Sequence, residues 1–428
     1  MLKRSNPSMP EARVIRVFEY ERLRVGDSGF EERHWEALGK WAERQTETYV
    51  EIWPGSVRFL HWVGVFEVDG LVIEILPKAE ESREEENRAE QASKWRNILL
   101  RLLREAGYLD VRTVEEAGLG LQNKTLIDVL FSQFLDACEL LFRRGLVRRY
   151  RPVARRRTAV KGRIDFQSNL RRGPGHAELI DTVALEYDRV NLLNLILKAA
   201  IEASALYAPS QFSRGRARRF AIDFQEWPSR PIRSSDFNAV RFDRKTEAYK
   251  RAIPLARLIL DKKNPDLAMG TKRVFSLLFD MNDLWEKAIF ARLRHEARCR
   301  NDLHLRAQRS KVFWRSGSGS IKTVRPDILV ERDDGIRVVL DTKWKVLSAP
   351  VPSDGDLKQI FVYDTLWKSE RGFLVYPKTG TSVLALGRYC VPDSDRELSC
   401  GLATTEVDPA KWSAESLLSI VGMSECDI

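Results

Sequence analysis

Two aspartates and a lysine stand close together in residues 325–345, the segment RPDILVERDDGIRVVLDTKWK. An apolar run, an Asp-Asp-Gly turn and a β-branched run follow Asp327, a pattern that predicts a hairpin. Side chains alternate along a strand, so Asp341 and Lys343 should share one face. Two carboxylates are hard oxygen ligands of the kind that Mg²⁺ prefers, and a nearby ammonium can neutralise charge on a phosphate. The segment therefore suits a metal-dependent phosphodiesterase site.

Alone, this triplet also fits a plainer interpretation, an exposed face that carries a cross-strand ion pair. The preceding segment, residues 281–300, favours the metal-site interpretation over the plain ion pair. It has a helical pattern in which Glu286 lies on a stripe with Phe290, Leu293 and Ala297. A carboxylate on an apolar face needs a partner, so we expect Glu286 to interact with another polar group.

A second helix is predicted for residues 356–367, DLKQIFVYDTLW. Gln359 and Tyr363 lie one turn apart on it, a pair that also fits an ordinary half-buried hydrogen-bonding face. Two strand-like runs follow it, GFLVYP at 372–377 and SVLALGRYCV at 382–391.

This succession of helix with Glu, hairpin with Pro-Asp and Asp-x-Lys, helix with Gln-x-x-x-Tyr and two strands resembles the PD-(D/E)xK nuclease superfamily. The Gln-x-x-x-Tyr helix looks like that of its RecB-type branch. The resemblance covers about residues 275–392, and the order of the elements is more specific than any one of them. It implies a restriction-endonuclease-like α/β fold and a Mg²⁺ cofactor.

Residue by residue, the resemblance implies that Asp327 and Asp341 bind the metal and that Lys343 serves the attacking water. Glu286 matches the helical acidic residue that often joins the metal shell. Gln359 matches the glutamine beside the site and completes the expected catalytic set, whereas Tyr363 looks more structural.

Four separate segments occur in the order seen in the McrC family, the nuclease subunits of modified-cytosine restriction systems. They are GVFEVDGLVIEILPKAE at 64–80, VKGRIDF at 160–166, EYDRVNLLNLILKAA at 186–200 and the NDLWEK helix. The family resemblance implies that the chain cuts DNA containing modified cytosine in complex with an McrB-like AAA+ ring that hydrolyses GTP. It also implies that the N-terminal part docks on this ring. The chain has no G-x-x-x-x-G-K-[ST] phosphate loop, so any nucleotide-driven motion must come from another polypeptide.

We expect an α/β multidomain chain. Residues 1–82 read as a small β-rich N-terminal domain that docks on the partner, with a disordered start to about residue 12. Residues 83–270 read as a mostly helical middle domain with a basic segment, and an acidic run near 80–90 opens its first helix. Residues 271–428 read as the PD-(D/E)xK nuclease domain, ending in a peripheral tail.

The formal charge of +10 suits a polyanionic partner. The excess of positive charge is concentrated in residues 143–172. This segment contains twelve Arg or Lys and one acidic residue, and aromatic residues are interspersed. Such a segment could follow DNA phosphates, or it could be a basic loop facing solvent or an acidic partner. The sequence leaves this choice open.

No secretory signal or apolar stretch of eighteen residues is present, which predicts a cytoplasmic protein without a membrane partner. The five cysteines are odd in number and lack metal-site spacing, so we expect reduced thiols.

We therefore expect a Mg²⁺-dependent DNA endonuclease subunit. Two alternatives remain at this stage. One is a non-catalytic adaptor that activates the ring, and the other is a stand-alone RecB-like DNA repair nuclease.

Overall fold

The computed structural model describes residues 13–78, 87–109, 125–171, 178–261, 274–347, 351–369, 371–378, 384–390, 398–414 and 416–422. The chain forms two compact units, Met1–Asn123 with Gly270–Ile428 as the first, and Lys124–Met269 as the second. The expected disordered start and most of the acidic run lie outside the described residues. The expected three-domain boundaries stay a prediction.

A four-stranded sheet opens the first unit, in the order β1-β6-β5-β10. β6 pairs parallel with β1 and antiparallel with β5, and β10, from much later in the chain, pairs antiparallel with β5. Gly64 permits this last pairing, because a Cβ there would meet the Leu277 carbonyl oxygen at 2.0 Å. The elements are β1 (Arg13–Phe18), β5 (Trp62–Val68), β6 (Leu71–Leu76) and β10 (Val274–Asp280), with a small sheet of β2 (Arg22–Arg24), β4 (Ser56–Phe59) and β3 (Val50–Trp53), and the helices η1 (Asp27–Gly29) and α1 (Glu32–Ala42).

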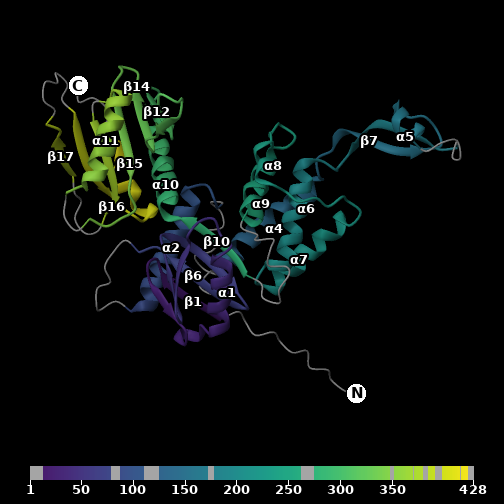
Figure 1. The fold of residues 1–428 in the computed structure, drawn as a ribbon, viewed down its shortest axis with the longest axis horizontal. Helices are drawn as coiled ribbons and strands as arrows, with labels where there is room; N and C mark the ends of the chain where they lie inside the picture. The colour runs from purple at the N-terminus through teal and green to yellow at the C-terminus, as the bar shows by residue number, and fades with distance from the viewer. Residues whose placement is uncertain are drawn as a thin grey trace. The chain divides into compact units, whose positions relative to one another are not determined.

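A six-stranded sheet carries the Asp-x-Lys segment, in the order β11-β14-β15-β16-β18-β17 (Figure 1). The expected hairpin is confirmed: β14 and β15 pair antiparallel around a turn in which Gly335 has φ +93°. The strands are β11 (Leu303–Ala307), β14 (Ile328–Arg332), β15 (Arg337–Thr342), β16 (Arg371–Pro377), β17 (Leu384–Arg388) and β18 (Ser399–Thr405), and a separate ribbon is formed by β12 (Lys311–Arg315) and β13 (Ile321–Val324).

β18 corrects one expectation, because we predicted a peripheral segment beyond residue 392. Instead, Ser399–Thr405 forms a strand inside the sheet, parallel to β16 on one side and antiparallel to β17 on the other. All but its first residue are buried. Its small and polar residues carry little strand signal, and the pairing that fixes it is with strands elsewhere in the chain.

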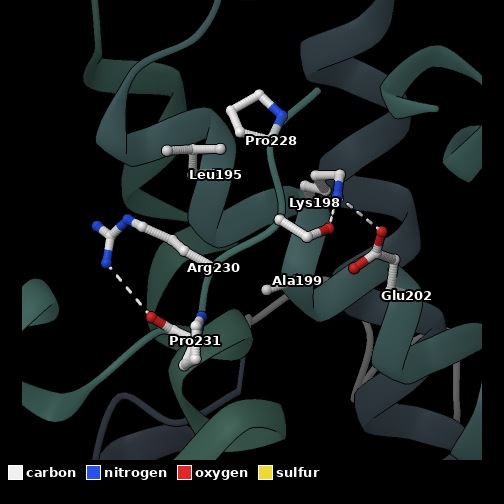
Figure 2. A pocket seen from close by; sticks show the side chains of 8 residues that line it. Leu195, Lys198, Ala199, Glu202, Pro228, Arg230 and Pro231 are labelled. Atoms are coloured by element: carbon white, nitrogen blue, oxygen red, sulfur yellow. Dashed lines mark hydrogen bonds and ion pairs between the residues drawn. The ribbon is translucent and has the colours of Figure 1, made fainter. Parts of the chain in front are cut away.

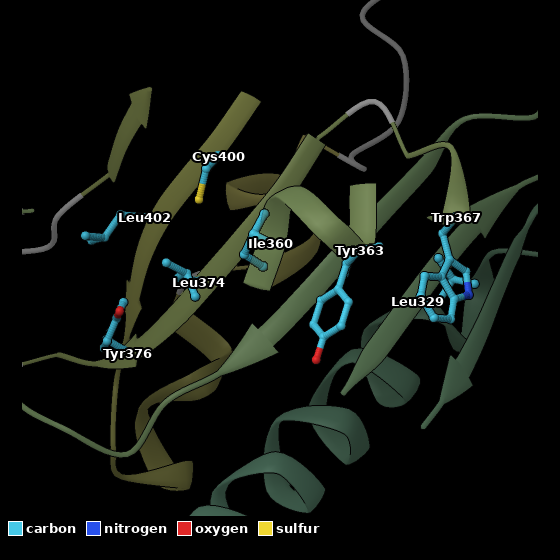
Figure 3. Close-up of a cluster of buried hydrophobic side chains, with 9 residues drawn as sticks. Leu329, Ile360, Tyr363, Trp367, Leu374, Tyr376, Cys400 and Leu402 are labelled. Carbon is cyan, nitrogen blue, oxygen red and sulfur yellow. The ribbon is translucent and has the colours of Figure 1, made fainter. Parts of the chain in front are cut away.

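Two helices flank the site strands. The N-cap of α10 (Met281–Glu296) is Asp280, whose side chain accepts from the Asn282 amide, and that of α11 (Asp354–Trp367) is Ser353, whose side chain accepts from the Asp356 amide. α11 packs on β15 and β16 through a cluster of buried side chains (Figure 3). Burying such side chains contributes about 1.5–3 kcal/mol each. The cluster comprises Leu329, Val339, Ile360, Tyr363, Trp367, Leu374, Tyr376, Cys400 and Leu402.

The remaining elements of the first unit pack around α10. The helix α2 (Arg88–Glu105) contacts α10, and its Arg101 guanidinium donates to both carboxylate oxygens of Asp408, at 2.8 and 2.6 Å. Glu296, at the end of α10, accepts from the backbone amides of Leu417 and Leu418. The other short helices here are η7 (Ala297–Cys299), η8 (Pro409–Ala414) and α12 (Leu417–Ile420).

The second unit combines helices with a three-stranded sheet of order β7-β9-β8. Its basic segment contains the strand β7, whose nine residues pair antiparallel with β9 and form cross-strand ion pairs such as Arg151–Asp188 and Arg157–Glu186. β7 and α5 extend away from the helices (Figure 1). The elements are α4 (Leu126–Arg144), β7 (Arg149–Arg157), β8 (Arg163–Ile164), α5 (Phe166–Leu170), β9 (Ile180–Asp188), α6 (Leu192–Tyr207), α7 (Gln211–Ala221), η4 (Ile222–Phe224), α8 (Ser234–Asn238), η5 (Glu247–Lys250) and α9 (Ala252–Asp261).

Across the described ranges, we find no helix with the length and apolar character needed to cross a bilayer.

Candidate functional site

Asp327 occupies the position just before β14. Its Oδ2 accepts two hydrogen bonds from Thr342, one from the backbone amide at 2.7 Å and one from Oγ1 at 2.8 Å. Both donors are on the last residue of β15, so the start of one hairpin strand is tied to the end of the other. This contact places Asp327 beside the Asp-x-Lys segment.

Asp341 and Lys343 form an ion pair in which Lys343 Nζ lies 2.7 Å from Asp341 Oδ2. The Lys343 amide donates to the Val375 carbonyl at 2.9 Å, which continues the pairing of β15 with β16 past the end of β15. Asp341 is only 2% exposed. The plainer interpretation, a solvent-exposed ion pair, is therefore wrong for this aspartate, and burying a carboxylate here requires a specific polar environment.

Gln359, on α11, joins these groups through its side-chain amide. Its Oε1 accepts from Lys343 Nζ at 2.9 Å, and its Nε2 donates to Asp341 Oδ1 at 3.2 Å and to Tyr363 Oη at 2.7 Å. Tyr363 Oη in turn donates to the Arg325 carbonyl at 3.0 Å. Because every polar atom of the Gln359 side chain is used, its orientation is fixed, and with it the relative positions of the carboxylate and the ammonium.

Glu286, on α10, accepts a hydrogen bond from Gln308 Nε2 at 2.8 Å. The Gln308 amide also donates to the Asp327 carbonyl at 2.9 Å, so this glutamine bridges Glu286 to the backbone of the site. Within the part of the chain that the structure describes, no three His, Cys, Asp or Glu residues are grouped closely enough to hold one metal ion. A direct metal contact for Glu286 stays a prediction.

The three carboxylates nevertheless affect one another electrostatically. Burial and the negative charge of Asp327 raise the pKa of Glu286 to about 7. The same two causes raise the pKa of Asp341 to about 6, although Lys343 opposes them. Burial also raises the pKa of Asp327, against the two hydrogen bonds from Thr342. Burial and mutual repulsion therefore disfavour the charged forms of these carboxylates, and a bound cation would favour them.

The donor set suits Mg²⁺. Asp341 Oδ2 is buried and, beyond its ion pair with Lys343, accepts no hydrogen bond from the described residues. Both Thr342 donors bond Oδ2 of Asp327 and leave its Oδ1 to other partners. Mg²⁺ usually binds one or two carboxylates and keeps several waters, so two such oxygens suffice.

Three residues that shape the site were not predicted from the sequence. Thr342 follows Asp341 directly, so alternation along the strand directs it away from the face of Asp341, yet its backbone and hydroxyl hold Asp327. Gln308 lies outside every motif, and no local signal marks it. Trp344, the residue after Lys343, is buried against Trp285, the residue before Glu286, with ring centroids 5.4 Å apart. Because side chains alternate along a strand, the sequence could have predicted that Trp344 points away from Lys343 and toward the protein interior.

A hollow in the second unit offers less chemistry (Figure 2). Lys198 faces it but is only 5% exposed, and its ammonium lies 3.0 Å from Glu202 Oε1 and donates to Ser229. The charge of the lysine is thus already neutralised. The group around Asp341 is the stronger candidate.

Comparison with known proteins identifies the family. The family model for the McrBC 5-methylcytosine restriction system component matches residues 57–377, well over half of the chain. The chain belongs to this family. The Type IV methyl-directed restriction enzyme EcoKMcrBC of Escherichia coli K12 is 24% identical over an alignment of 311 residues that covers 67% of this chain and 87% of that protein.

Solved structures give the fold. A chain of the refined half-complex from a tetradecameric assembly of Thermococcus gammatolerans McrB AAA+ hexamers with bound McrC has a TM-score of 0.61 and 20% identity, covering 94% of this chain and 97% of that one. A chain of the cryo-EM structure of the Thermococcus gammatolerans McrBC complex has a TM-score of 0.48 and 21% identity, covering 65% and 86%. The expected McrC family is confirmed, and this member has a mixed α/β, McrC-like fold.

The family match includes the whole candidate site of this McrC-family chain. Its range extends from β4 to the end of β16 and so contains Glu286, Asp327, Asp341, Lys343 and Gln359.

Proposed function

We propose that this McrC-family chain is the nuclease subunit of a modified-cytosine restriction system and hydrolyses DNA phosphodiester bonds with Mg²⁺. The observation that carries the proposal is the convergence of Asp327, Asp341 and Lys343 on one another, held by Gln359. A buried and a half-buried carboxylate beside an ammonium are costly to maintain and suit a charged substrate with a metal.

Asp327 Oδ1 and Asp341 Oδ2 would hold the metal, the latter while also paired with Lys343, and Glu286 would join the metal shell directly or through a water. When bound, Mg²⁺ supplies positive charge that polarises the scissile phosphate and lowers the pKa of a bound water. The network from Tyr363 through Gln359 keeps the Asp341 carboxylate from rotating. Binding would therefore require little reorganisation of the ligands.

Lys343 acts in its protonated form. Burial lowers the pKa of Lys343, but the ion pair with Asp341, with Asp356 and Asp327 nearby, more than offsets this, so the net pKa is raised. Its Nζ therefore keeps its proton at neutral pH. It serves the attacking water by orienting it and neutralises charge that grows on the phosphate oxygens.

The finer organisation is part of the proposal. Residues 271–428 would form the PD-(D/E)xK nuclease domain, with its site between α10, α11 and the β14–β15 hairpin. Residues 1–82 would dock on an McrB-like AAA+ ring and stimulate its GTP hydrolysis. The relative from Thermococcus gammatolerans, solved with McrB hexamers, supports this partner. Recognition of modified cytosine would then belong to the ring.

A reconstituted cutting assay tests the function. The purified full-length chain is incubated with Mg²⁺ and methylated or unmethylated plasmid, with and without its cognate AAA+ GTPase and GTP. We expect cutting of methylated plasmid only when GTPase and GTP are present, and no cutting after Mg²⁺ is removed with EDTA.

The two other functions predict different results. Cutting without the GTPase would replace the proposal with a stand-alone repair-type nuclease. An adaptor would stimulate the GTPase without cutting under any of these conditions.

A further inference from the structure

A short ribbon rises from the sheet beside the candidate site. β11 and β14 are antiparallel neighbours that end at the pair Ala307 and Ile328. Between them, β12 and β13 pair with each other and with no other strand. Both ends of this insertion contact the site, since the Gln308 amide donates to the Asp327 carbonyl and the Arg325 carbonyl accepts from Tyr363 Oη.

The root of the ribbon is anchored on α11. Lys311 Nζ donates to the Leu366 carbonyl at 2.7 Å and lies 4.9 Å from the centre of the Trp367 ring. These contacts lie at the C-terminal end of α11, where a cation is favoured by the exposed carbonyls. The helix that carries Gln359 thus also holds the ribbon.

Large apolar side chains on the ribbon are exposed. Phe313 is 53% exposed, Trp314 50% and Ile321 51%, and every residue of β12 is exposed. The register shifts between Val312 and Trp314, and such bulges re-aim side chains. A two-stranded ribbon is marginally stable without a covering layer, and aromatic residues displayed on one are typical of a binding surface.

The charge of this region is entirely positive. Residues 303–326 contain six Arg or Lys and no Asp or Glu. Within the described ranges, Arg315 and Lys322 lie near no carboxylate with which they could pair. Four cationic side chains but a single carboxylate, Glu331, line a hollow of about 240 Å³ at the root of the ribbon; its lining is Arg306, Arg309, Ser310, Lys311, Leu329, Glu331, Arg337 and Trp367.

We propose that the β12–β13 ribbon binds duplex DNA next to the scissile phosphate, an inference that rests on the proposed nuclease function. Arg315 and Lys322 contact backbone phosphates, and Phe313 and Trp314 pack against bases or sugars in a groove. A two-stranded ribbon has the width that the major groove of B-DNA admits. Unpaired cations select a polyanion, which favours DNA over a protein surface as the occupant.

DNA binding by the full-length chain in EDTA tests the ribbon without cutting. The probe is a fluorescein-labelled 40-base-pair duplex, and anisotropy is measured over a series of salt concentrations. We expect the double variant Phe313→Ser, Trp314→Ser to bind about tenfold more weakly than the parent. The single variant Trp314→Phe, which keeps an aromatic ring, should lose much less affinity. The double variant Arg315→Gln, Lys322→Gln should lower the salt dependence of log Kd by about two.

Matched controls separate the ribbon from general surface effects. Leu386→Ser removes another exposed apolar side chain of the same unit, and Arg24→Gln with Lys40→Gln removes the same charge elsewhere. Neither should change Kd more than twofold. Parental affinity in both ribbon variants overturns the proposal and leaves a protein partner as the occupant of the ribbon.

The cutting assay distinguishes this failure from failure of the function. Ribbon variants that bind and cut like the parent, while Asp341→Asn does not cut, contradict the ribbon proposal alone. If Asp341→Asn cuts like the parent, the proposed function is wrong. Circular dichroism of each ribbon variant should match the parent, because the side chains replaced on the ribbon are exposed.

Discussion

Trp344 Nε1 donates a hydrogen bond of 2.8 Å to Glu19 Oε1, although 325 positions separate the two residues. Glu19 follows β1 of the N-terminal sheet, and Trp344 follows Lys343 directly. Glu19 Oε1 also accepts from the Lys78 amide, whereas its Oε2 is buried without a hydrogen-bond partner among the described residues. The strand that carries the site is thus tied to the N-terminal sheet.

The stability of this connection should depend on pH. Burial raises the pKa of Glu19 from 4.5 to about 7, against the hydrogen bonds from Lys78 and Trp344. Between these values the folded chain holds more of this proton than the unfolded chain does. The free energy of unfolding therefore falls as pH rises through this range, by about 3 kcal/mol for this group. We expect Glu19→Gln to lose this part of the pH dependence and to be more stable than the parent at pH 8.

Urea unfolding of both proteins at pH 5 and pH 8 measures the difference, with surface Glu51→Gln as the control. A parental pH dependence in Glu19→Gln would contradict the assignment.

Gln359 should act as a positioning residue. Replacing it with Leu removes the acceptor for Lys343 Nζ and the donor to Asp341, and we expect kcat for cutting to fall about 10- to 100-fold, as for other residues that orient metal ligands. KM for DNA should change little, and more Mg²⁺ should be needed for half-maximal rate. Tyr363→Phe keeps the Gln359 amide in place, so its kcat should fall less than that of Gln359→Leu. Equal losses in both variants, or a loss confined to KM, would argue against this role.

The approach of α11 to the sheet depends on Gly372 in β16. A Cβ at this position would lie 2.2 Å from Ile360 Cγ2 and 2.9 Å from both carboxylate oxygens of Asp364, all within α11. Gly372→Ala should therefore push α11 outward, reduce stability by about 1–3 kcal/mol and lower cutting by displacing Gln359.

Gly387→Ala is the matched control in the same sheet, because its Cβ would meet only the Cys400 carbonyl, at 3.8 Å. Thermal unfolding and cutting rates of both variants check the prediction. Parental stability and activity in Gly372→Ala would show that α11 is free to shift.

Local patterns in the sequence predicted which side chains of the candidate site would lie close together. A period of two along β15 placed Asp341 and Lys343 on one face, and the one-turn spacing in α11 placed Gln359 above Tyr363. The contact of Gln359 with the ion pair was not a local property. It follows from packing α11 on β16 at Gly372, and the family resemblance supplied that expectation.

Non-local pairing explains what was missed. β10 joins a sheet formed some 200 positions earlier, and Trp344 bonds to Glu19 across nearly the whole chain. No strand was predicted for the basic segment because its charges obscure strand alternation, and β7 pairs with β9, whose acidic residues form ion pairs with it. Such partners are visible only once the chain is folded.

The most direct test of the account is single-turnover cutting of methylated plasmid by the assembled complex, comparing the parent with Asp341→Asn. Asp334→Asn, in the exposed turn of the same hairpin, is the matched control. Loss of a metal-binding carboxylate should reduce the rate more than about 100-fold in Asp341→Asn. Its stability should not fall below that of the parent, because a buried carboxylate of raised pKa has been removed. Cutting at the parental rate by a folded Asp341→Asn would contradict the central claim that this site hydrolyses DNA.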